Sequence, residues 1–326
     1  MSSFVFSSGD INGIGPEICI KTFNKIYNPS VRTLTFVCPV NVFENIIDNI
    51  KPNFNYKITK NITDISPEFV NIVNIKNVKQ NFGKPTKSSG RASYESILKS
   101  LKIIDKGKAE ALITAPISKY AFSLAGIDFP GHTELLGNWF NTKSFVMFFI
   151  SNSIKVGLVT IHEPVKSIAK NITKKNLRKT ISVIRESLLN DFGKINPTIA
   201  VLGLNPHAGE NGKIGLEEEN IISPVIEEFN NVEGPFVSDA FFGNRLYNKY
   251  DAVIGMYHDQ VLIPFKMLQF YKGINFTAGL PIVRTSPDHG TAFDIAGKYT
   301  ANETSICEAF KWSEKILNKR KRFLNG

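Results

Sequence analysis

Short apolar runs alternate with longer amphipathic segments along most of the chain. The runs predict strands at Phe4–Ser7, Leu34–Cys38, Ala111–Thr114, Ser144–Ile150, Lys155–Thr160, Thr198–Gly203 and Ala252–Met256. Between many of them, apolar residues at helical spacing predict helices, including Pro16–Ile26, Tyr94–Lys106, Lys174–Asn190 and Glu217–Asn230. This alternation is typical of an α/β protein with a mainly parallel sheet covered on both faces. The Asn-, Ile- and Lys-rich segment from Asn41 to Gln80 is expected to be peripheral.

A glycine-containing loop, GDINGIG, separates the first predicted strand from the first predicted helix, where Pro16 suits the first turn. The loop does not have the GxGxxG spacing, and no acidic residue clearly ends the next strand about 20 residues later, as a Rossmann dinucleotide site requires. The cofactor-binding residues therefore remain undetermined.

Polar loops follow four of the predicted strands directly. Thr114 leads into APISK, Thr160 into IHEPV, Gly203 into LNPHAGE and Met256 into YHDQ. Open parallel sheets bind ligands beyond the carboxyl ends of their strands, so we expect these loops to share one cleft.

The five histidines are the strongest chemical signal, because three of them, His162, His207 and His258, closely follow predicted strands. Three neutral imidazoles can hold a divalent cation and leave open positions for a substrate. A single histidine in a loop is more often a hydrogen-bonding residue, so the competing interpretation is that the three brace their loops.

Residues that suit an anionic substrate follow His258. Lys266, Asn275 and Arg284 supply cationic and amide donors, which a phosphate or carboxylate requires. The motif GHTE adds His132 and Thr133, although a threonine followed by an acidic residue is also common at a helix start.

Composition narrows the class of protein further. The chain has 326 residues, of which 42% are hydrophobic and 21% charged, enough for a core without disulfides. Cys19, Cys38 and Cys307 show no metal-ligand spacing and are expected to be buried thiols. The longest apolar runs fall short of the roughly 20 residues of a membrane helix, so we expect a cytoplasmic protein without a membrane partner.

The net charge of +10 is compatible with small anionic substrates. Its lysines are scattered rather than gathered with aromatic residues, so a nucleic-acid partner is not expected.

The motifs GHTE, HEPV, NPHAGE, MYHDQ and GLPIVRTSPDHGTAFDIAG, together with the opening SGDINGIGPEI, resemble the 4-hydroxythreonine-4-phosphate dehydrogenases of pyridoxine biosynthesis. The resemblance extends from Gly9 to Gly297. It implies NAD- or NADP-dependent oxidation of 4-phosphooxy-L-threonine at C3, with decarboxylation to 3-amino-2-oxopropyl phosphate. It also implies a divalent metal (zinc, magnesium or cobalt) and a homodimer whose active site is shared between subunits.

The implied fold is that of the isocitrate and isopropylmalate dehydrogenases, with the active-site cleft between two α/β domains. We expect the first domain at 1–130 plus about 285–326, and the second, with the metal ligands and dimer contacts, at about 131–284.

Carried over residue by residue, the resemblance implies metal ligands and substrate-binding residues. The metal ligands are His162, His207 and His258, and the substrate-binding residues are His132, Thr133, Lys266, Asn275 and Arg284. The general base stays open, with Asp239 and Asp259 as candidates for that role or for orienting a ligating imidazole.

The chain departs from the family pattern at two places. Ile11 and Asn12 stand where the family often has Pro and Ala, and Val261 stands where a DQG turn has its glycine. Valine tolerates positive φ poorly, so this turn is expected to change. Alternative functions are a dehydrogenase of a related phosphorylated acid, such as a threonate or erythronate, and a metal-dependent hydrolase.

Overall fold

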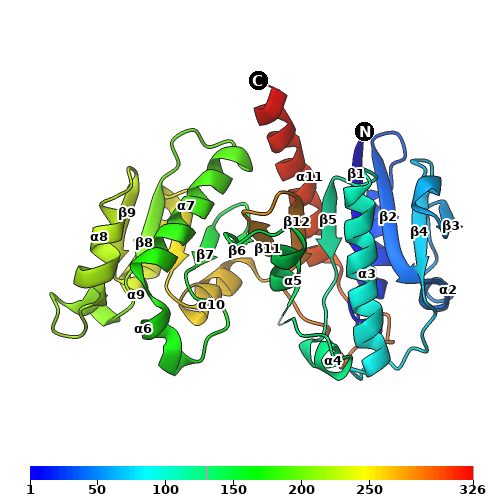
Figure 1. The fold of residues 1–326 in the computed structure, drawn as a ribbon, viewed down its shortest axis with the longest axis horizontal. Coiled ribbons are helices and arrows are strands. Elements are labelled where there is room, and N and C mark those ends of the chain that lie inside the picture. Colours follow the sequence, from blue (N-terminus) through cyan, green and yellow to red (C-terminus); the bar gives the residue numbers. More distant parts are fainter. Residues whose placement is uncertain (130, 326) are drawn as a thin grey trace. The chain divides into compact units, whose positions relative to one another are not determined.

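The computed structural model describes residues 1–129 and 131–325 and contains two compact units (Figure 1). Unit 1 comprises Met1–Trp139 and Ile282–Leu317, and unit 2 comprises Phe140–Pro281 and the chain from Asn318 onward. The expected domain boundaries lie near these divisions, except that the end of the last helix falls in unit 2. Whether the units are separate folding domains stays a prediction.

Unit 1 is built on a parallel sheet with the strand order β3-β4-β2-β1-β5-β12. Its strands are β1 (Ser2–Ser7), β2 (Arg32–Pro39), β3 (Tyr56–Thr59), β4 (Val70–Ile75), β5 (Ala111–Thr114) and β12 (Val283–Pro287). Its helices are α1 (Gly15–Ile26), α2 (Val40–Ile47), α3 (Lys87–Asp105), α4 (Lys119–Leu124), α5 (His132–Trp139) and α11 (Thr304–Asn325), with a 3₁₀ turn at Ile62–Asp64.

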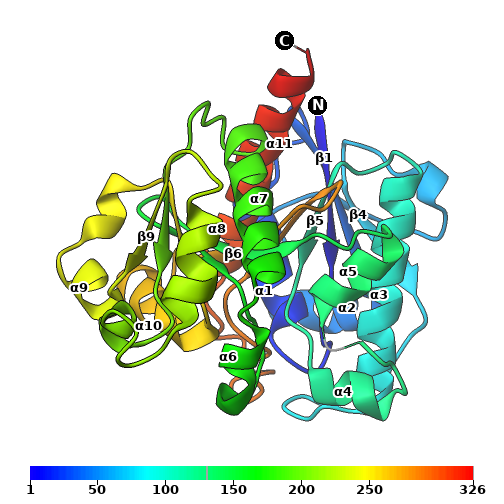
Figure 2. The ribbon, with the colours of Figure 1, turned by 60° about the vertical axis from the view of Figure 1, so that its left-hand side comes forward.

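The core of unit 1 is aromatic. The rings of Phe6 and Phe23 meet edge to face at 4.9 Å, and Phe23 also meets Phe36 at 5.5 Å. Helix α3 packs across β1, β2 and β5 (Figure 2). It begins at a capping box in which the side chains of Thr86 and Ser89 each bond to the other's backbone N–H, satisfying two donors of the first turn.

Unit 2 has a mixed sheet with the order β11-β6-β7-β10-β8-β9, in which only the pairs that involve β6 are antiparallel. Its strands are β6 (Val146–Ile150), β7 (Lys155–Leu158), β8 (Ile199–Leu202), β9 (Val232–Phe236), β10 (Ala252–Gly255) and β11 (Ile274–Ala278). Its helices are α6 (Ile168–Asn171), α7 (Lys174–Asn190), α8 (Ser223–Ile226), α9 (Ser238–Gly243) and α10 (His258–Gln269). Short 3₁₀ turns lie at Val165–Ser167, Pro206–Gly209 and Leu246–Lys249, and a π-helix at Glu218–Ile222.

Helices α7 and α10 cover opposite faces of this sheet. Val156 and Leu158 of β7 share a hydrophobic cluster with Val261 of α10. Gly157 points to the other face, because successive strand residues alternate. A Cβ at Gly157 would lie 2.1 Å from Cδ1 of Ile184 in α7, so α7 approaches the sheet closely there.

The mainly parallel α/β fold is confirmed, and each predicted strand overlaps an observed one. Residues 41–80 form the outer edge of the sheet, with β3 as the edge strand and β4 beside it, so the segment is peripheral as predicted, but it adds two strands that the pattern did not predict. The helix predicted at Glu217–Asn230 is also different. A π-helix leads into α8, which ends at Ile226, and Pro224 has no N–H to continue a regular hydrogen-bond ladder.

The three cysteines are free and buried, as predicted. No helix within residues 1–129 and 131–325 combines the length and the apolar character that crossing a membrane requires.

Candidate metal and substrate site

The strand order of unit 2 brings the three candidate metal ligands to one edge of its sheet. β10 lies between β7 and β8 and is parallel to both, so the carboxyl ends of the three strands are neighbours. His162, His207 and His258 each follow one of these ends within five residues. This is the edge at which open parallel sheets bind ligands.

Two of these histidines lie close together. The rings of His162 and His258 have their centroids 5.9 Å apart and are tilted by 38°. The loop that carries His162 is held to the end of β10, because Thr160 donates from its backbone N and its Oγ1 to the Met256 carbonyl, at 3.1 and 2.7 Å. The pairing of β7 with β10 therefore continues beyond the strands and positions both imidazoles.

His258 is the first residue of α10, and its Nδ1 lies 2.7 Å from Oδ1 of Asp259. An Nδ1–H donated to this carboxylate leaves Nε2 as the ring atom with a lone pair for a ligand. The side chain of Asp259 is 72% exposed, so the contact orients the ring more than it stabilises the fold.

Gln260 connects the loops on which His258 and His207 lie. Its Oε1 accepts from Met256 N at 2.6 Å, and its Nε2 donates to the Gly203 carbonyl at 2.6 Å and to Oγ of Ser238 at 2.8 Å. One side chain thus joins the ends of β10 and β8 and the start of α9.

His207 lies in a strained segment. Six consecutive residues from His207 to Gly212 have positive φ, and the four that are not glycine have φ between 45° and 54°. Left-handed backbone costs a non-glycine residue roughly 1–2 kcal/mol. Such a run persists only where surrounding contacts determine it, and it is most often found at functional sites.

Two of the three predicted metal ligands are brought together within one chain. The close pair of imidazoles fits a divalent cation that prefers nitrogen ligands. However, within the part of the chain that the structure describes, no group of three or more His, Cys, Asp or Glu side chains is placed to hold a metal ion.

Unit 1 contains a buried cation near an imidazole whose Nε2 is buried. Arg284 of β12 is 2% exposed, and its Nε and Nη2 donate to Oγ1 of Thr114 at 3.1 and 2.6 Å. Burial lowers the pKa of Arg284 to about 9, which leaves the guanidinium charged at neutral pH. Burial, and then the nearby charge of Arg284, hold the pKa of His132 well below its usual 6.5, so His132 is neutral.

This pair has the chemistry of an anion site. Nε2 of His132 is buried and has no hydrogen-bond partner among residues 1–129 and 131–325. Thr133, the next residue of α5, is also buried. The charge of Arg284 interacts with the Glu134 carboxylate, and a phosphate or carboxylate ligand could in addition bond the unsatisfied imidazole nitrogen.

The remaining two predicted substrate residues belong to unit 2. Lys266 lies in the last turn of α10, and Asn275 lies on β11 opposite Phe149. Oδ1 of Asn275 is buried without a hydrogen-bond partner in the described chain. Of the five predicted residues, three are therefore in unit 1 and two in unit 2.

Comparison with known proteins decides the family. Residues 30–313 match the family model of the pyridoxal phosphate biosynthetic protein PdxA. The chain belongs to the PdxA family. It is 36% identical over 323 residues to a 4-hydroxythreonine-4-phosphate dehydrogenase of Bacteroides thetaiotaomicron, covering 97% of this chain and 89% of that protein. A protein of the same name from Aquifex aeolicus is 38% identical, with 95% and 97% covered.

Solved structures agree with the PdxA assignment. The crystal structure of 4-hydroxythreonine-4-phosphate dehydrogenase from Klebsiella pneumoniae superimposes with a TM-score of 0.84 at 32% identity, covering 97% of this chain and 100% of that one. Isocitrate dehydrogenase from Methylococcus capsulatus shares the fold, with a TM-score of 0.50 at 13% identity, 100% of this chain and 89% of that one being covered.

One departure from the PdxA pattern behaves differently from expectation. Val261 is the fourth residue of α10 and does not have positive φ, so the backbone here is helical and forms no separate turn. Its side chain is fully buried against β7 and β10. A helical conformation suits valine, so the missing glycine strains nothing here.

The two candidate bases both lie at helix starts. Asp239 is exposed in the first turn of α9, and Asp259 contacts His258. Sequence reasoning missed two further residues of this PdxA-family chain, Gln260 and Thr114. Gln260 stands within the MYHDQ motif and Thr114 directly precedes a polar loop, so their position was the only available signal.

Proposed function

We propose that this PdxA-family protein is a 4-hydroxythreonine-4-phosphate dehydrogenase. It oxidises 4-phosphooxy-L-threonine at C3 with NAD or NADP and releases the carboxylate to give 3-amino-2-oxopropyl phosphate, in the biosynthesis of pyridoxal phosphate. The observation that carries the proposal is the placement of His162, His207 and His258 at three adjacent strand ends in a chain of this family. A cytoplasmic location stays a prediction.

His162, His207 and His258 would hold a divalent cation. Imidazole nitrogen suits Zn²⁺ and neighbouring transition metals such as Co²⁺, whereas Mg²⁺ prefers oxygen, so the donor set favours zinc or cobalt over magnesium. When bound, the cation would lower the pKa of the C3 hydroxyl and polarise the ketone that oxidation leaves. The Asp259 carboxylate keeps the His258 ring in the orientation that presents Nε2.

The substrate's anionic groups require fixed donors that orient C3 for hydride transfer. Arg284 offers a guanidinium already held by Thr114, and Lys266 and Asn275 add a cation and an amide. Neutral His132 can donate or accept at its unpartnered Nε2, and Thr133 adds a hydroxyl.

A homodimer with a shared site accounts for an exposed apolar face on α10. Ile263, Met267, Phe270 and Tyr271 are between 57% and 82% exposed and lie at helical spacing. Contiguous apolar patches of this kind mark protein contacts. The helix begins at His258, so a second copy covering this face would approach the metal ligands, of which one chain gathers only part.

Light scattering after size exclusion tests the dimer. Met267→Asp places a charge in the covered face and is expected to give monomers that have lost activity. Val165→Asp is the matched control, because Val165 is 85% exposed and lies in a different segment of unit 2. If Met267→Asp and wild type elute with the same mass, the proposed dimer surface is wrong.

Nicotinamide absorbance with 4-phosphooxy-L-threonine tests the reaction. We expect NADH or NADPH to form only after a divalent metal is added, and His207→Ala to lose metal content and turnover together. If the protein turns over a phosphorylated threonate or erythronate faster than 4-phosphooxy-L-threonine, that acid is its substrate instead. Metal-dependent phosphate release without reduction of NAD(P) would identify a hydrolase instead.

A further inference from the structure

The segment that presents His207 is anchored at its start by one buried carboxylate. Glu218, 3% exposed, accepts from the backbone N of Leu204 at 2.7 Å and of Asn205 at 2.8 Å, both at Oε1. Its Oε2 accepts from Nδ2 of Asn205 at 2.9 Å. Three donors thus converge on one side chain just before His207, which determines the direction in which the chain leaves β8.

The same carboxylate also lies against the middle of the left-handed run. A Cβ at Gly203 would lie 3.2 Å from Oε1 of Glu218, and one at Gly209 would lie 2.8 Å from Oε2. Gly209 has a φ of 80°. The loop therefore passes close to the Glu218 carboxylate at Gly203 and Gly209, where a side chain would crowd it.

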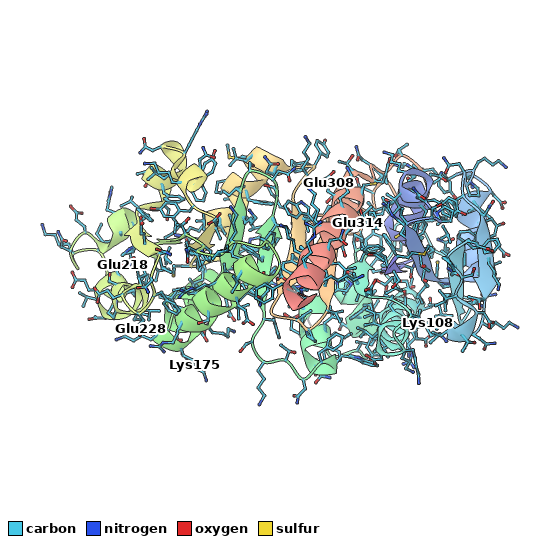
Figure 3. The ribbon with its side chains drawn as sticks, turned by 90° about the horizontal axis from the view of Figure 1, so that it is seen from above. Lys108, Lys175, Glu218, Glu228, Glu308 and Glu314 are labelled. Atoms are coloured by element: carbon cyan, nitrogen blue, oxygen red, sulfur yellow. The ribbon has the colours of Figure 1, made fainter. Side chains whose placement is uncertain are left out.

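Glu218 is the first residue of the π-helix, a wide turn that is rare and frequent at functional sites. It lies in the yellow-green part of unit 2 (Figure 3). Its neighbour Glu219 is exposed and belongs to the same turn. The two glutamates share charge and helical context but differ in burial and contacts: Glu218 accepts bonds from Leu204 and Asn205, whereas the carboxylate of Glu219 lies near Gly212.

We propose that Glu218 is a positioning residue that holds His207 in the conformation required of a metal ligand. The inference rests on the proposed metal site. Local hydrogen bonds run from Ala208 N to the Asn205 carbonyl and from Glu210 N to the His207 carbonyl. The buried Glu218 carboxylate adds bonds to the backbone just before the left-handed run and lies against Gly209 in its middle. Without the carboxylate, the N–H groups of Leu204 and Asn205 lose their acceptor and the segment relaxes, carrying the imidazole away.

The variants are Glu218→Ala, Glu218→Gln and the matched control Glu219→Gln. Glu218→Gln keeps one oxygen that can accept from both backbone N–H groups, so it tests the position with the least disturbance of the fold. Circular dichroism establishes that each variant is folded.

The first measurement is hydrogen exchange on metal-free protein, which needs no activity. We expect the amides of residues 204–209 to exchange at least tenfold faster in Glu218→Ala and less so in Glu218→Gln. In Glu219→Gln, whose side chain lies against Gly212, these amides are expected to exchange as in wild type. Equal exchange in Glu218→Ala and wild type overturns the proposal.

The second measurement is titration with Co²⁺, whose visible absorption reports its coordination. We expect the Kd for Co²⁺ to rise about 10- to 100-fold in Glu218→Ala, with a changed spectrum, and to rise less in Glu218→Gln. Unchanged Kd and spectrum in both Glu218 variants overturn the positioning role while leaving the metal site intact. If wild type and His207→Ala bind Co²⁺ equally, the proposed metal site itself is wrong and the role of Glu218 fails with it.

Discussion

Replacing Gln260 with methionine should weaken the connection between the loops of His258 and His207. Gln260 makes three hydrogen bonds, to Met256 N, the Gly203 carbonyl and Oγ of Ser238, at 2.6 to 2.8 Å. Methionine has a similar length and a similar helix propensity, so the change removes the polar contacts with little effect on α10 itself.

The expected cost follows from the groups left behind. Met256 and Gly203 are buried, so their N–H and carbonyl groups lose a partner without gaining water. An unsatisfied buried polar group costs about 1–3 kcal/mol, which gives about 2–4 kcal/mol for the pair after partial relaxation. For a unit of this size, that lowers the midpoint of thermal unfolding by roughly 5–10 °C.

Urea denaturation monitored by circular dichroism measures this loss, with Gln269→Met as the control on the same helix. Gln269 is the last residue of α10, and within residues 1–129 and 131–325 its side chain makes no hydrogen bond. We also expect weaker Co²⁺ binding in Gln260→Met than in Gln269→Met. Equal unfolding free energies for the two variants would refute the reasoning, because the three hydrogen bonds would then stabilise the fold no more than hydrogen bonds to water do.

Three further predictions concern other parts of the molecule. Arg284→Lys keeps the charge but loses the planar guanidinium with its several fixed N–H donors. KM for 4-phosphooxy-L-threonine should therefore rise about 10- to 100-fold in steady-state assays, while kcat changes less. Because burial depresses the pKa of His132, the unfolded state alone takes up its proton below pH 6.5, and stability falls as pH drops. Urea unfolding between pH 7 and 5.5 should therefore show a loss about 1 kcal/mol larger in wild type than in His132→Asn. Val261→Gly should destabilise unit 2 by about 3 kcal/mol in the same assay, because it removes a buried side chain and adds a helical glycine.

The hydrophobic pattern predicted the elements that obey simple rules. β5 and α7 have the bounds that their apolar residues indicate. β4 was missed because Asn71 interrupts its apolar run. The structure tolerates this amide because its Nδ2 donates to the carbonyls of Leu34, Ser66 and Phe69, and its Oδ1 accepts from Ser66 N. A hydrophobic pattern cannot predict that a polar residue is buried when all of its hydrogen bonds are made within the protein.

The sequence predicted the positions of the candidate site residues along the chain but not how strand order brings them together. Each of His162, His207 and His258 follows a strand that the sequence indicates, so their common edge could be expected. That β10 lies between β7 and β8 could not, because strand order depends on contacts between distant segments. Gln260 acts through that order, since its bond to the Gly203 carbonyl joins residues 57 positions apart. The bonds of Glu218 to Leu204 and Asn205 are nearer in sequence, but a buried carboxylate is not part of a hydrophobic pattern.

Three features that local rules do not predict lie at proposed ligand-binding residues. The left-handed run after His207, the buried charge of Arg284 and the unpartnered Nε2 of His132 each cost free energy in the protein alone. None of them improves the packing of a sheet or a helix. Sequences normally remove such conflicts between local preference and fold, and functional sites are where they are most often retained. The three conflicts fall on proposed metal-ligating or substrate-binding residues, and this agreement is independent of the motifs that first suggested those roles.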